Sequence, residues 1–142
     1  MTWADPASLA ALHACCFERP RPWTAAEFAD LLNSRGAFLL AEPGGFLLGR
    51  ELAGEAELLT LAVAPSARGS GLGLRLVDAF AATALQRGAA RAFLEVAADN
   101  LAARRLYDRA GWVEAGRRKR YYGPETDAIV MRLTLRADQE GG

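Results

Sequence analysis

A glycine-rich loop between an apolar segment and a helical segment constrains this chain more than any other feature. After Pro65 the sequence runs Arg68-Gly69-Ser70-Gly71-Leu72-Gly73. Glycine lets the backbone approach an anion closely, and the first N–H groups of a helix have no partner inside the helix. The loop therefore predicts a phosphate cradle, with a plain tight turn as the alternative.

Two familiar phosphate-binding loops do not match this spacing. A P-loop has Lys-Ser or Lys-Thr after its last glycine, whereas Leu74-Arg75 follows here. The dinucleotide fingerprint places its third glycine three residues after the second, whereas Gly73 comes two residues after Gly71. The chain after the loop is also too short for a doubly wound sheet and a substrate domain.

Composition limits the function further. The 142 residues are 51% hydrophobic and 24% charged, which suits one domain with a real core. Seventeen basic residues balance seventeen acidic ones, so no global field favours nucleic acid or an anionic membrane. We predict a single domain over residues 1–136 and a frayed tail at 137–142.

The cysteines and the lack of a targeting signal indicate the cellular compartment of the protein. The two cysteines, Cys15 and Cys16, are adjacent and badly placed for a disulfide, and no second pair suggests zinc. No basic segment precedes an apolar run at the N-terminus, and no apolar run reaches about 18 residues. We expect a soluble cytoplasmic protein without a metal ion or a membrane partner.

Apolar spacing and capping residues predict four helices and the strands between them. Asp5 before Pro6 is a favourable helix start, and Thr24 with Glu27 forms a capping box. The expected helices begin near residues 6, 24, 72 and 100. The expected strands are 38–40, 46–48, 58–63, 92–96 and 129–135.

The loop and this order of elements together resemble the GNAT superfamily of N-acetyltransferases. The resemblance implies an α/β (α+β) fold with a single mixed, mostly antiparallel sheet flanked by helices. The first strand would be short or missing, because only residues 1–4 precede the first helix. It also implies acetyl-coenzyme A as co-substrate and no metal. The implied coenzyme contacts are Leu61, Ala62, Val63, Arg68, Gly69, Ser70, Gly71, Leu72, Gly73, Asn100 and Tyr107.

A narrower resemblance is to the RimI-type N-terminal acetyltransferases. The run Leu94-Glu95-Val96, then Asn100, Leu106-Tyr107 and Gly111-Trp112, follows the order of that subfamily. The resemblance implies an N-terminal alanine of a ribosomal protein as acceptor. Arg120 stands where the subfamily usually has Asn, and Thr126 where it commonly has Glu.

The same resemblance suggests which residues act. Glu95 would accept the proton of the amine and Tyr107 would protonate the leaving thiolate. The alternatives are a solvated strand-end Glu95 and a Tyr107 that only packs in the core, while Asn100 fits a helix cap as well as a coenzyme contact. The residues proposed to bind the acceptor are Trp23, Glu95, Arg118, Tyr121 and Tyr122.

Other functions remain open from the sequence. The same fold and coenzyme would suit a small-molecule amine or a protein lysine as acceptor, or a non-catalytic acyl-coenzyme A-binding module. The basic run 117–120 with two tyrosines behind it would suit an RNA-associated adaptor, although four residues on a neutral chain predict no direct nucleic-acid binding. A covalent mechanism would use Cys15 or Cys16, with His13 as the nearest base on the same helix.

Overall fold

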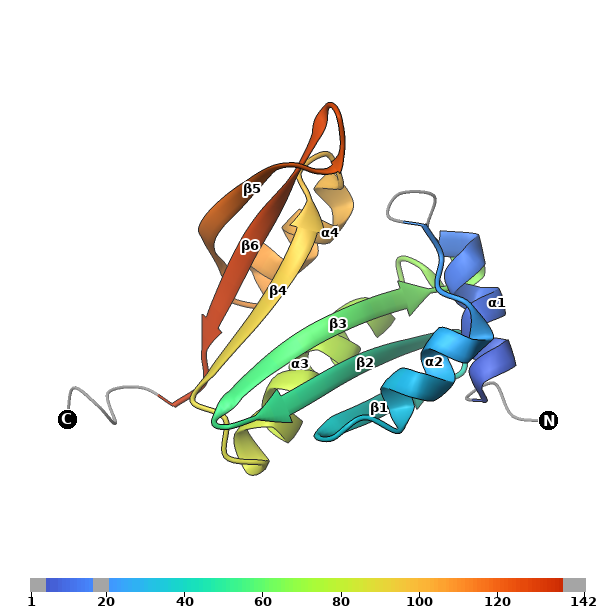
Figure 1. Ribbon diagram of the computed structural model, residues 1–142, viewed down its shortest axis with the longest axis horizontal. Helices are drawn as coiled ribbons and strands as arrows, with labels where there is room; N and C mark the ends of the chain where they lie inside the picture. The colour runs from blue at the N-terminus through green and yellow to red at the C-terminus, as the bar shows by residue number, and fades with distance from the viewer. Residues whose placement is uncertain (1–4, 17–20, 137–142) are drawn as a thin grey trace.

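A six-stranded sheet forms the centre of the computed structural model, which describes residues 5–16 and 21–136 (Figure 1). The strand order is β1-β2-β3-β4-β6-β5, and every neighbouring pair is antiparallel except β3 and β4. The predicted mixed, mostly antiparallel sheet is therefore confirmed. The strands are β1 (Ala37–Glu42), β2 (Gly45–Leu52), β3 (Glu55–Val63), β4 (Arg91–Ala97), β5 (Val113–Gly123) and β6 (Thr126–Thr134).

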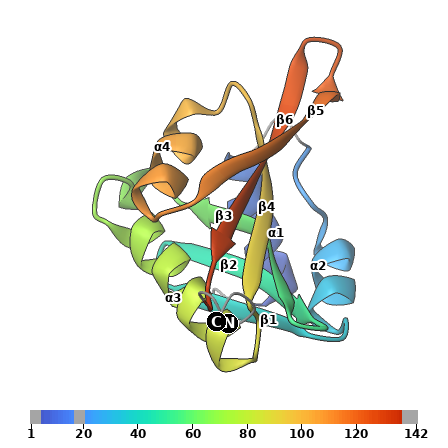
Figure 2. The ribbon, with the colours of Figure 1, turned by 90° about the vertical axis from the view of Figure 1, so that its left-hand side faces the viewer.

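Helices cover the sheet from both sides (Figure 2). Helices α1 (Pro6–Cys16) and α2 (Ala25–Leu32) lie on one face, and α3 (Leu72–Gln86) and α4 (Leu101–Arg109) lie on the other. The predicted helix starts are confirmed at their caps. Oδ1 of Asp5 accepts from the N–H of Ser8 at 2.7 Å, and Thr24 and Glu27 form both bonds of a capping box.

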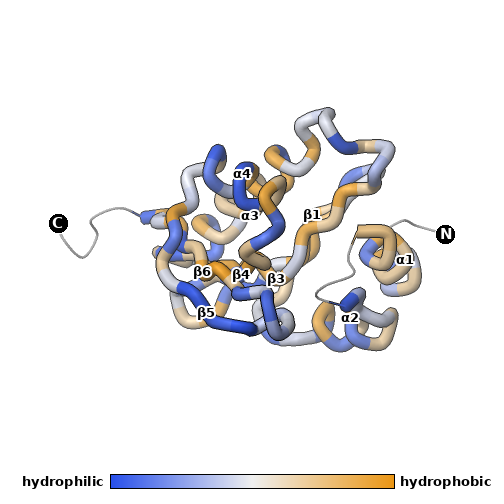
Figure 3. The backbone as a smooth tube through the Cα atoms, turned by 90° about the horizontal axis from the view of Figure 1, so that it is seen from above, coloured by the Kyte–Doolittle hydropathy of each residue, from blue (hydrophilic) through white to orange (hydrophobic). Residues whose placement is uncertain are grey.

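Two apolar clusters hold these layers together. Under α3 and α4, the rings of Phe38, Phe80 and Trp112 stack in a row with centroids 5.7 and 6.1 Å apart. Under α1 and α2, Phe28 packs edge-on against Phe46 at 5.5 Å, with both side chains fully buried. Burial on both faces positions the central strands, whereas β5 is a mostly exposed edge strand. Figure 3 shows that hydrophilic residues predominate along β5.

Strands β3 and β4 separate after a short stretch of pairing. Their register runs only from Glu55 with Arg91 to Glu57 with Phe93, although β3 continues to Val63 and β4 to Ala97. Figure 1 shows the two strands diverging from that point. The sheet is therefore open at the C-terminal ends of both strands, where backbone groups and side chains are left for a ligand.

A β-bulge in β3 lies beside this opening. Leu48 of β2 pairs with Thr60 while Gly49 pairs with Leu58, so Leu59 is an extra residue in β3. Before the bulge Leu58 faces the cluster under α3, and after it Leu61 does. A bulge reverses the alternation of side chains along a strand. It thereby turns the side chains at the end of β3 toward the face that carries the glycine loop.

Several details differ from the sequence-based expectation. Strand β3 begins at Glu55, three residues earlier than expected, because Ala53 and Gly54 form a tight turn with φ of 56° and 87°. Residues 1–4, where a short or missing first strand is expected, and the tail 137–142 lie outside the described residues. Within residues 5–16 and 21–136, no helix is long and apolar enough to cross a membrane.

Candidate active site

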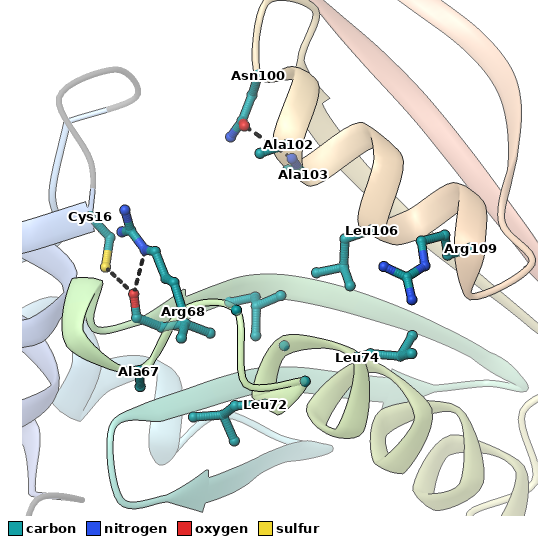
Figure 4. Close-up of a pocket in the computed structure, with 15 residues that line it drawn as sticks. Cys16, Ala67, Arg68, Leu72, Leu74, Asn100, Ala102, Ala103, Leu106 and Arg109 are labelled. Carbon is teal, nitrogen blue, oxygen red and sulfur yellow. Dashed lines mark hydrogen bonds between the residues drawn. The ribbon is translucent and has the colours of Figure 1, made fainter.

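A cavity of about 580 Å³ opens between the end of β3, the glycine loop and α4 (Figure 4). Its floor is the first turn of α3, and its opposite wall is one side of α4. The charged side chains that line it, Arg68 and Arg109, are both cationic. An elongated ligand that carries negative charge fits such a cavity.

The glycine loop shapes the anionic end of this cavity. Gly69 and Gly71 have φ of 80° and 85°, a region that residues with a Cβ rarely adopt. Gly71 is the N-cap of α3, and no side chain caps that end. The first N–H groups of a 15-residue helix therefore remain for an anion. Gly73 has a different role, since a Cβ there would meet Cδ2 of Leu106 at 3.2 Å.

The last carbonyl of β3 is held by two side chains (Figure 4). Nε of Arg68 donates to the Val63 oxygen at 3.0 Å, and Sγ of Cys16 donates to the same oxygen at 3.3 Å. The loop and the end of α1 are thereby joined to the end of β3. This anchors the glycine loop next to the opening between the strands.

A second cavity, of about 120 Å³, lies on the other side of the opening. It is lined by residues of β3 and β4 together with Trp23, Tyr107 and Tyr122. Leu61, Asn100 and Ala103 line both cavities, so the two spaces meet at the end of β3 and the start of α4. A ligand in the first cavity and another in the second would therefore be neighbours.

Tyr107 closes the second cavity from α4. Its side chain is 6% exposed, and its ring packs against Trp112 with centroids 6.0 Å apart. Burial, and secondarily the nearby Tyr122, raise the pKa of Tyr107 above its usual value. Burial, together with Glu95, also raises the pKa of Tyr122 to about 12. Both phenols therefore stay protonated near neutral pH and remain hydrogen-bond donors.

Glu95 lies opposite, on β4, and is paired with Arg118 of β5. Nε of Arg118 is 2.5 Å from Oε2 of Glu95, whose side chain is 24% exposed. The Arg118 guanidinium lies over the ring of Tyr121 at 5.4 Å, and Tyr121 packs edge-on against Tyr122 at 5.1 Å. Of these β5 residues, Tyr122 lines the second cavity, and Arg118 and Tyr121 contact residues that line it.

Asp127 holds this part of β5 in place. Its Oδ1 accepts from the N–H of Arg120 at 2.9 Å and its Oδ2 from Nη1 of Arg117 at 3.0 Å. These bonds, the Arg120 N–H bond first, lower the pKa of Asp127 below its usual range. Arg120 has φ of 56°, where Asn is more stable than Arg.

The structure brings most of the predicted site residues together. Leu61, Val63, Arg68, Gly69, Gly71, Leu72, Gly73 and Asn100 line the first cavity, and Trp23, Glu95, Tyr107 and Tyr122 line the second. Asn100 also caps α4 by accepting from the N–H of Ala103 at 3.1 Å.

Four predicted residues lie outside both linings. The Ala62 side chain is buried under α1 and α2, and Oγ of Ser70 donates to the Ala67 oxygen at 2.6 Å within the loop. Arg118 and Tyr121 reach the second cavity only through Glu95 and Tyr122.

Sequence reasoning missed part of both walls. The first cavity is also lined by Cys16, Ala67, Leu74, Ala102, Ala103, Leu106 and Arg109, and the second by His13 and Thr60. The apolar stripe of α4 is read from sequence as core packing, because helical spacing does not distinguish a core face from a ligand face. Within the described ranges, no group of three or more His, Cys, Asp or Glu is arranged to hold a metal ion.

A glycine-lined cavity with two arginines on one side of a strand opening, and a cavity with a carboxylate on the other, suit an enzyme that binds an anionic co-substrate and an acceptor side by side. The chain belongs to the acetyltransferase (GNAT) family, whose model matches residues 6–112. It is therefore an acetyl-coenzyme A-dependent N-acetyltransferase, and the glycine loop and the arginines suit the phosphates of that coenzyme.

Individual relatives narrow the resemblance to RimI-type enzymes. The chain is 36% identical over 122 residues to the ribosomal protein bS18-alanine N-acetyltransferase of Escherichia coli K12, covering 80% of this chain and 82% of that one. It is 36% identical over 142 residues to the N-alpha-acetyltransferase RimI of Mycobacterium tuberculosis, covering 93% and 88%. It spans only 39% of an uncharacterised Mycobacterium leprae protein that is 35% identical over 142 residues.

A solved structure agrees with these relatives. The crystal structure of the ribosomal-protein-S18-alanine N-acetyltransferase from Escherichia coli superposes with a TM-score of 0.85 at 28% identity. The match covers 100% of this chain and 95% of that one. The predicted family, fold and enzyme class are therefore confirmed.

Proposed function

We propose that this chain transfers an acetyl group from acetyl-coenzyme A to the α-amino group of an N-terminal alanine of a ribosomal protein. The observation that carries the proposal is the likeness to the Escherichia coli enzyme named for that substrate, at 36% sequence identity and with a TM-score of 0.85. Ribosomal proteins are made in the cytoplasm, so the proposal also implies a cytoplasmic enzyme. The reaction is proposed to be a direct attack with both substrates bound, since the two cavities adjoin.

The first cavity is proposed to bind the coenzyme. The N–H groups of the loop and of the first turn of α3 would bind its phosphates, with Arg68 and Arg109 as the nearby cations. The end of β3, from Leu61 to Val63, would border the part of the ligand that reaches toward the second cavity. Acetyl-coenzyme A supplies the acetyl group as a thioester, and no metal ion is required.

The second cavity is proposed to bind the peptide N-terminus. A free α-amino group has a pKa near 7.7–8.0, against about 10.4 for lysine, so its deprotonation near neutral pH costs roughly 3.4 kcal/mol less. One carboxylate base is enough for such a substrate. Glu95 lines the cavity and is proposed to accept the proton, directly or through a water molecule.

Tyr107 is proposed to be the general acid. Its phenol lines the second cavity, close to Ala103 and Asn100, which line both cavities. Because its pKa is raised by burial, the hydroxyl keeps its proton until negative charge develops on a leaving sulfur. Trp23, Tyr121, Tyr122 and Arg118 would frame the peptide entrance.

The positions of the cysteines favour direct attack over a covalent acetyl-cysteine. Sγ of Cys16 donates to the Val63 oxygen, and Cys15 is exposed. Both ring nitrogens of His13 are hydrogen-bonded, to the N–H of Trp23 and to Oγ1 of Thr60, so the ring is not directed at either thiol. A thiol without a base is a weak nucleophile at neutral pH.

Thiol release from acetyl-coenzyme A tests the proposal, with peptides that differ only in their first residue. We expect turnover of a free N-terminal alanine and none of the same peptide with a blocked N-terminus. Turnover of lysine side chains or of a small amine, but not of N-termini, would replace the proposed acceptor. Tight coenzyme binding without turnover of any amine would instead indicate a binding module. Glu95→Gln should abolish most turnover while leaving coenzyme affinity nearly unchanged.

A further inference from the structure

His13 is the single histidine of the chain, and the proposed chemistry does not use it. It belongs to α1, is 1% exposed, and lines the second cavity together with Glu95 and Tyr107. A buried polar side chain at the wall of a binding cavity has an energetic cost that only its hydrogen bonds offset. Its bonding partners therefore indicate what it does.

Both ring nitrogens of His13 bond to other parts of the cavity wall. Nδ1 accepts from the backbone N–H of Trp23 at 3.1 Å, and Nε2 lies 2.9 Å from Oγ1 of Thr60. Because Nδ1 is an acceptor, a neutral ring carries its proton on Nε2 and donates it to Thr60. The Thr60 hydroxyl accepts this bond, so its own proton is directed away from the ring.

The partners of His13 come from two separate segments. Trp23 precedes α2, and Thr60 lies in β3 next to the extra residue of the bulge. The His13 ring also stacks on the Trp23 indole, with centroids 5.1 Å apart and an interplanar angle of 24°. Both Trp23 and Thr60 line the second cavity. One side chain thus joins α1, the start of α2 and the bulged strand around the space proposed for the acceptor.

The His13 ring keeps one protonation state, which suits it to holding its two hydrogen-bond partners in place. Burial lowers the pKa of His13 to about 4, against the opposing effect of the nearby Glu27 carboxylate. If Nδ1 were protonated, its N–H would face the backbone N–H of Trp23, and two donors in contact repel each other. The ring therefore stays neutral near physiological pH and keeps one tautomer.

We propose that His13 is a positioning residue that sets the shape of the acceptor cavity by holding Trp23 and Thr60 at its two ring nitrogens. The inference rests on the proposed binding of the acceptor in the second cavity. It predicts that His13 governs the affinity for the acceptor and has no influence on the coenzyme, whose cavity it does not line. Each of its two hydrogen bonds is testable separately.

Three variants separate these two bonds. His13→Asn keeps an acceptor near the position of Nδ1, His13→Gln keeps a donor near the position of Nε2, and Thr60→Val removes the hydroxyl. We expect each to raise the KM for the acceptor about five- to tenfold, with coenzyme Kd within about twofold of the wild type. The control is Ala89→Gly, a fully buried position at the N-terminal side of β4, which should lower stability without changing either constant.

Because the chain has one histidine, a nitrogen NMR spectrum of histidine-labelled protein reads its state directly. We expect the Nε2–H tautomer throughout pH 5.5–8, and a larger shift on adding acceptor peptide than on adding acetyl-coenzyme A. An Nδ1–H tautomer, titration near the usual histidine pKa, or an equal loss of coenzyme affinity in the variants would overturn the proposal.

A failure of the proposed acceptor would be distinguishable from a failure of this inference. If the wild type acetylates lysine or a small amine instead of N-termini, the same KM comparison is made with that acceptor. An unchanged KM in all three variants would then refute the role of His13, whichever acceptor is used. If no amine is acetylated at all, the role of His13 in acceptor binding is refuted together with the proposed function, whatever the tautomer.

Discussion

Arg118 reaches across β6 to form an ion pair with Glu95, with Nε of Arg118 2.5 Å from Oε2 of Glu95. Arg118 of β5 and Ala97 of β4 both pair with Ala128 of β6, so their side chains lie on one face of the sheet. Glu95 precedes Ala97 by two residues on β4 and therefore lies on the same face. The basic run of β5 therefore serves the proposed base rather than forming an independent patch. Arg117 is likewise paired, with Asp127, so two of the four cations of the run are engaged within the protein.

Arg118→Gln should lower kcat/KM for the acceptor about fivefold, because an ion pair of this exposure is worth up to about 1 kcal/mol and here orients Glu95. The free energy of unfolding should fall by no more than that amount, and coenzyme affinity should not change. Steady-state kinetics and a thermal melt check this. The control is Arg35→Gln, an exposed arginine next to Gly36, for which an equal loss of activity would contradict the expectation.

Tyr107→Phe should lower kcat about 100-fold, since general acid catalysis typically contributes that much or more. The ring and its contact with Trp112 are kept, so the melting temperature should change little. Single-turnover kinetics at saturating coenzyme provide the measurement. A Tyr107→Phe enzyme as active as the wild type would remove Tyr107 from the mechanism.

Gly73→Ala should weaken acetyl-coenzyme A binding about fivefold. The new Cβ would meet Cδ2 of Leu106 at 3.2 Å, so this side chain at the cavity wall must give way by a few tenths of an ångström, and overpacking of this kind costs about 1–3 kcal/mol. Titration calorimetry with the coenzyme measures the change. Gly116→Ala is the matched control, because its Cβ would have an ordinary contact of 3.9 Å with Val130. Equal affinities in the two variants would refute the expectation.

Ala53→Asn should raise the free energy of unfolding by about 0.5–1 kcal/mol. Ala53 has φ of 56° and precedes Gly54 with φ of 87°, a turn for which Asn-Gly is the preferred pair. Denaturant titration measures the gain, and activity should be unchanged because the turn lies at the paired end of β3. Ala53→Val should lower the free energy of unfolding. An increase with valine would contradict the expectation, because it would show that the turn does not keep its positive φ.

Stability should fall as the pH is lowered from about 6.5 to 4. The native His13 has a pKa of about 4 against 6.5 when unfolded, so the unfolded state binds more protons in this interval. The total loss is roughly 3 kcal/mol, and stability above pH 6.5 should not depend on this group. Denaturant titrations at each pH check the slope. His13→Asn should remove it, and a wild-type protein equally stable at pH 6.5 and 4.5 would disprove the shift.

Local features were predicted well from sequence. The capping box of Thr24 and Glu27, the Asn100 cap and the glycine loop depend on residues a few positions apart, and all form as expected. Glu95 and Tyr107, the proposed catalytic pair, line one cavity. Their roles stay predictions until the variants are measured.

Contacts between distant segments were not predictable in the same way. The run from Leu58 to Val63 is almost uniformly apolar, so its pattern does not show that Leu59 is the extra residue of a bulge. The bond from His13 to Thr60 joins residues 47 positions apart. From sequence alone, His13 was indistinguishable from a core histidine.

By itself the sequence determined the helix starts, the glycine loop and the family, because caps, turns and loop spacing are set by residues close together in the chain. Only the tertiary structure decided where β3 leaves β4, which side chains the bulge turns toward the first cavity, and that Arg118 pairs with Glu95. These features depend on how the helices pack against the two faces of the sheet, and this packing involves residues that are far apart in the sequence. The cavity proposed for the acceptor forms because the two central strands separate after Glu57 and Phe93.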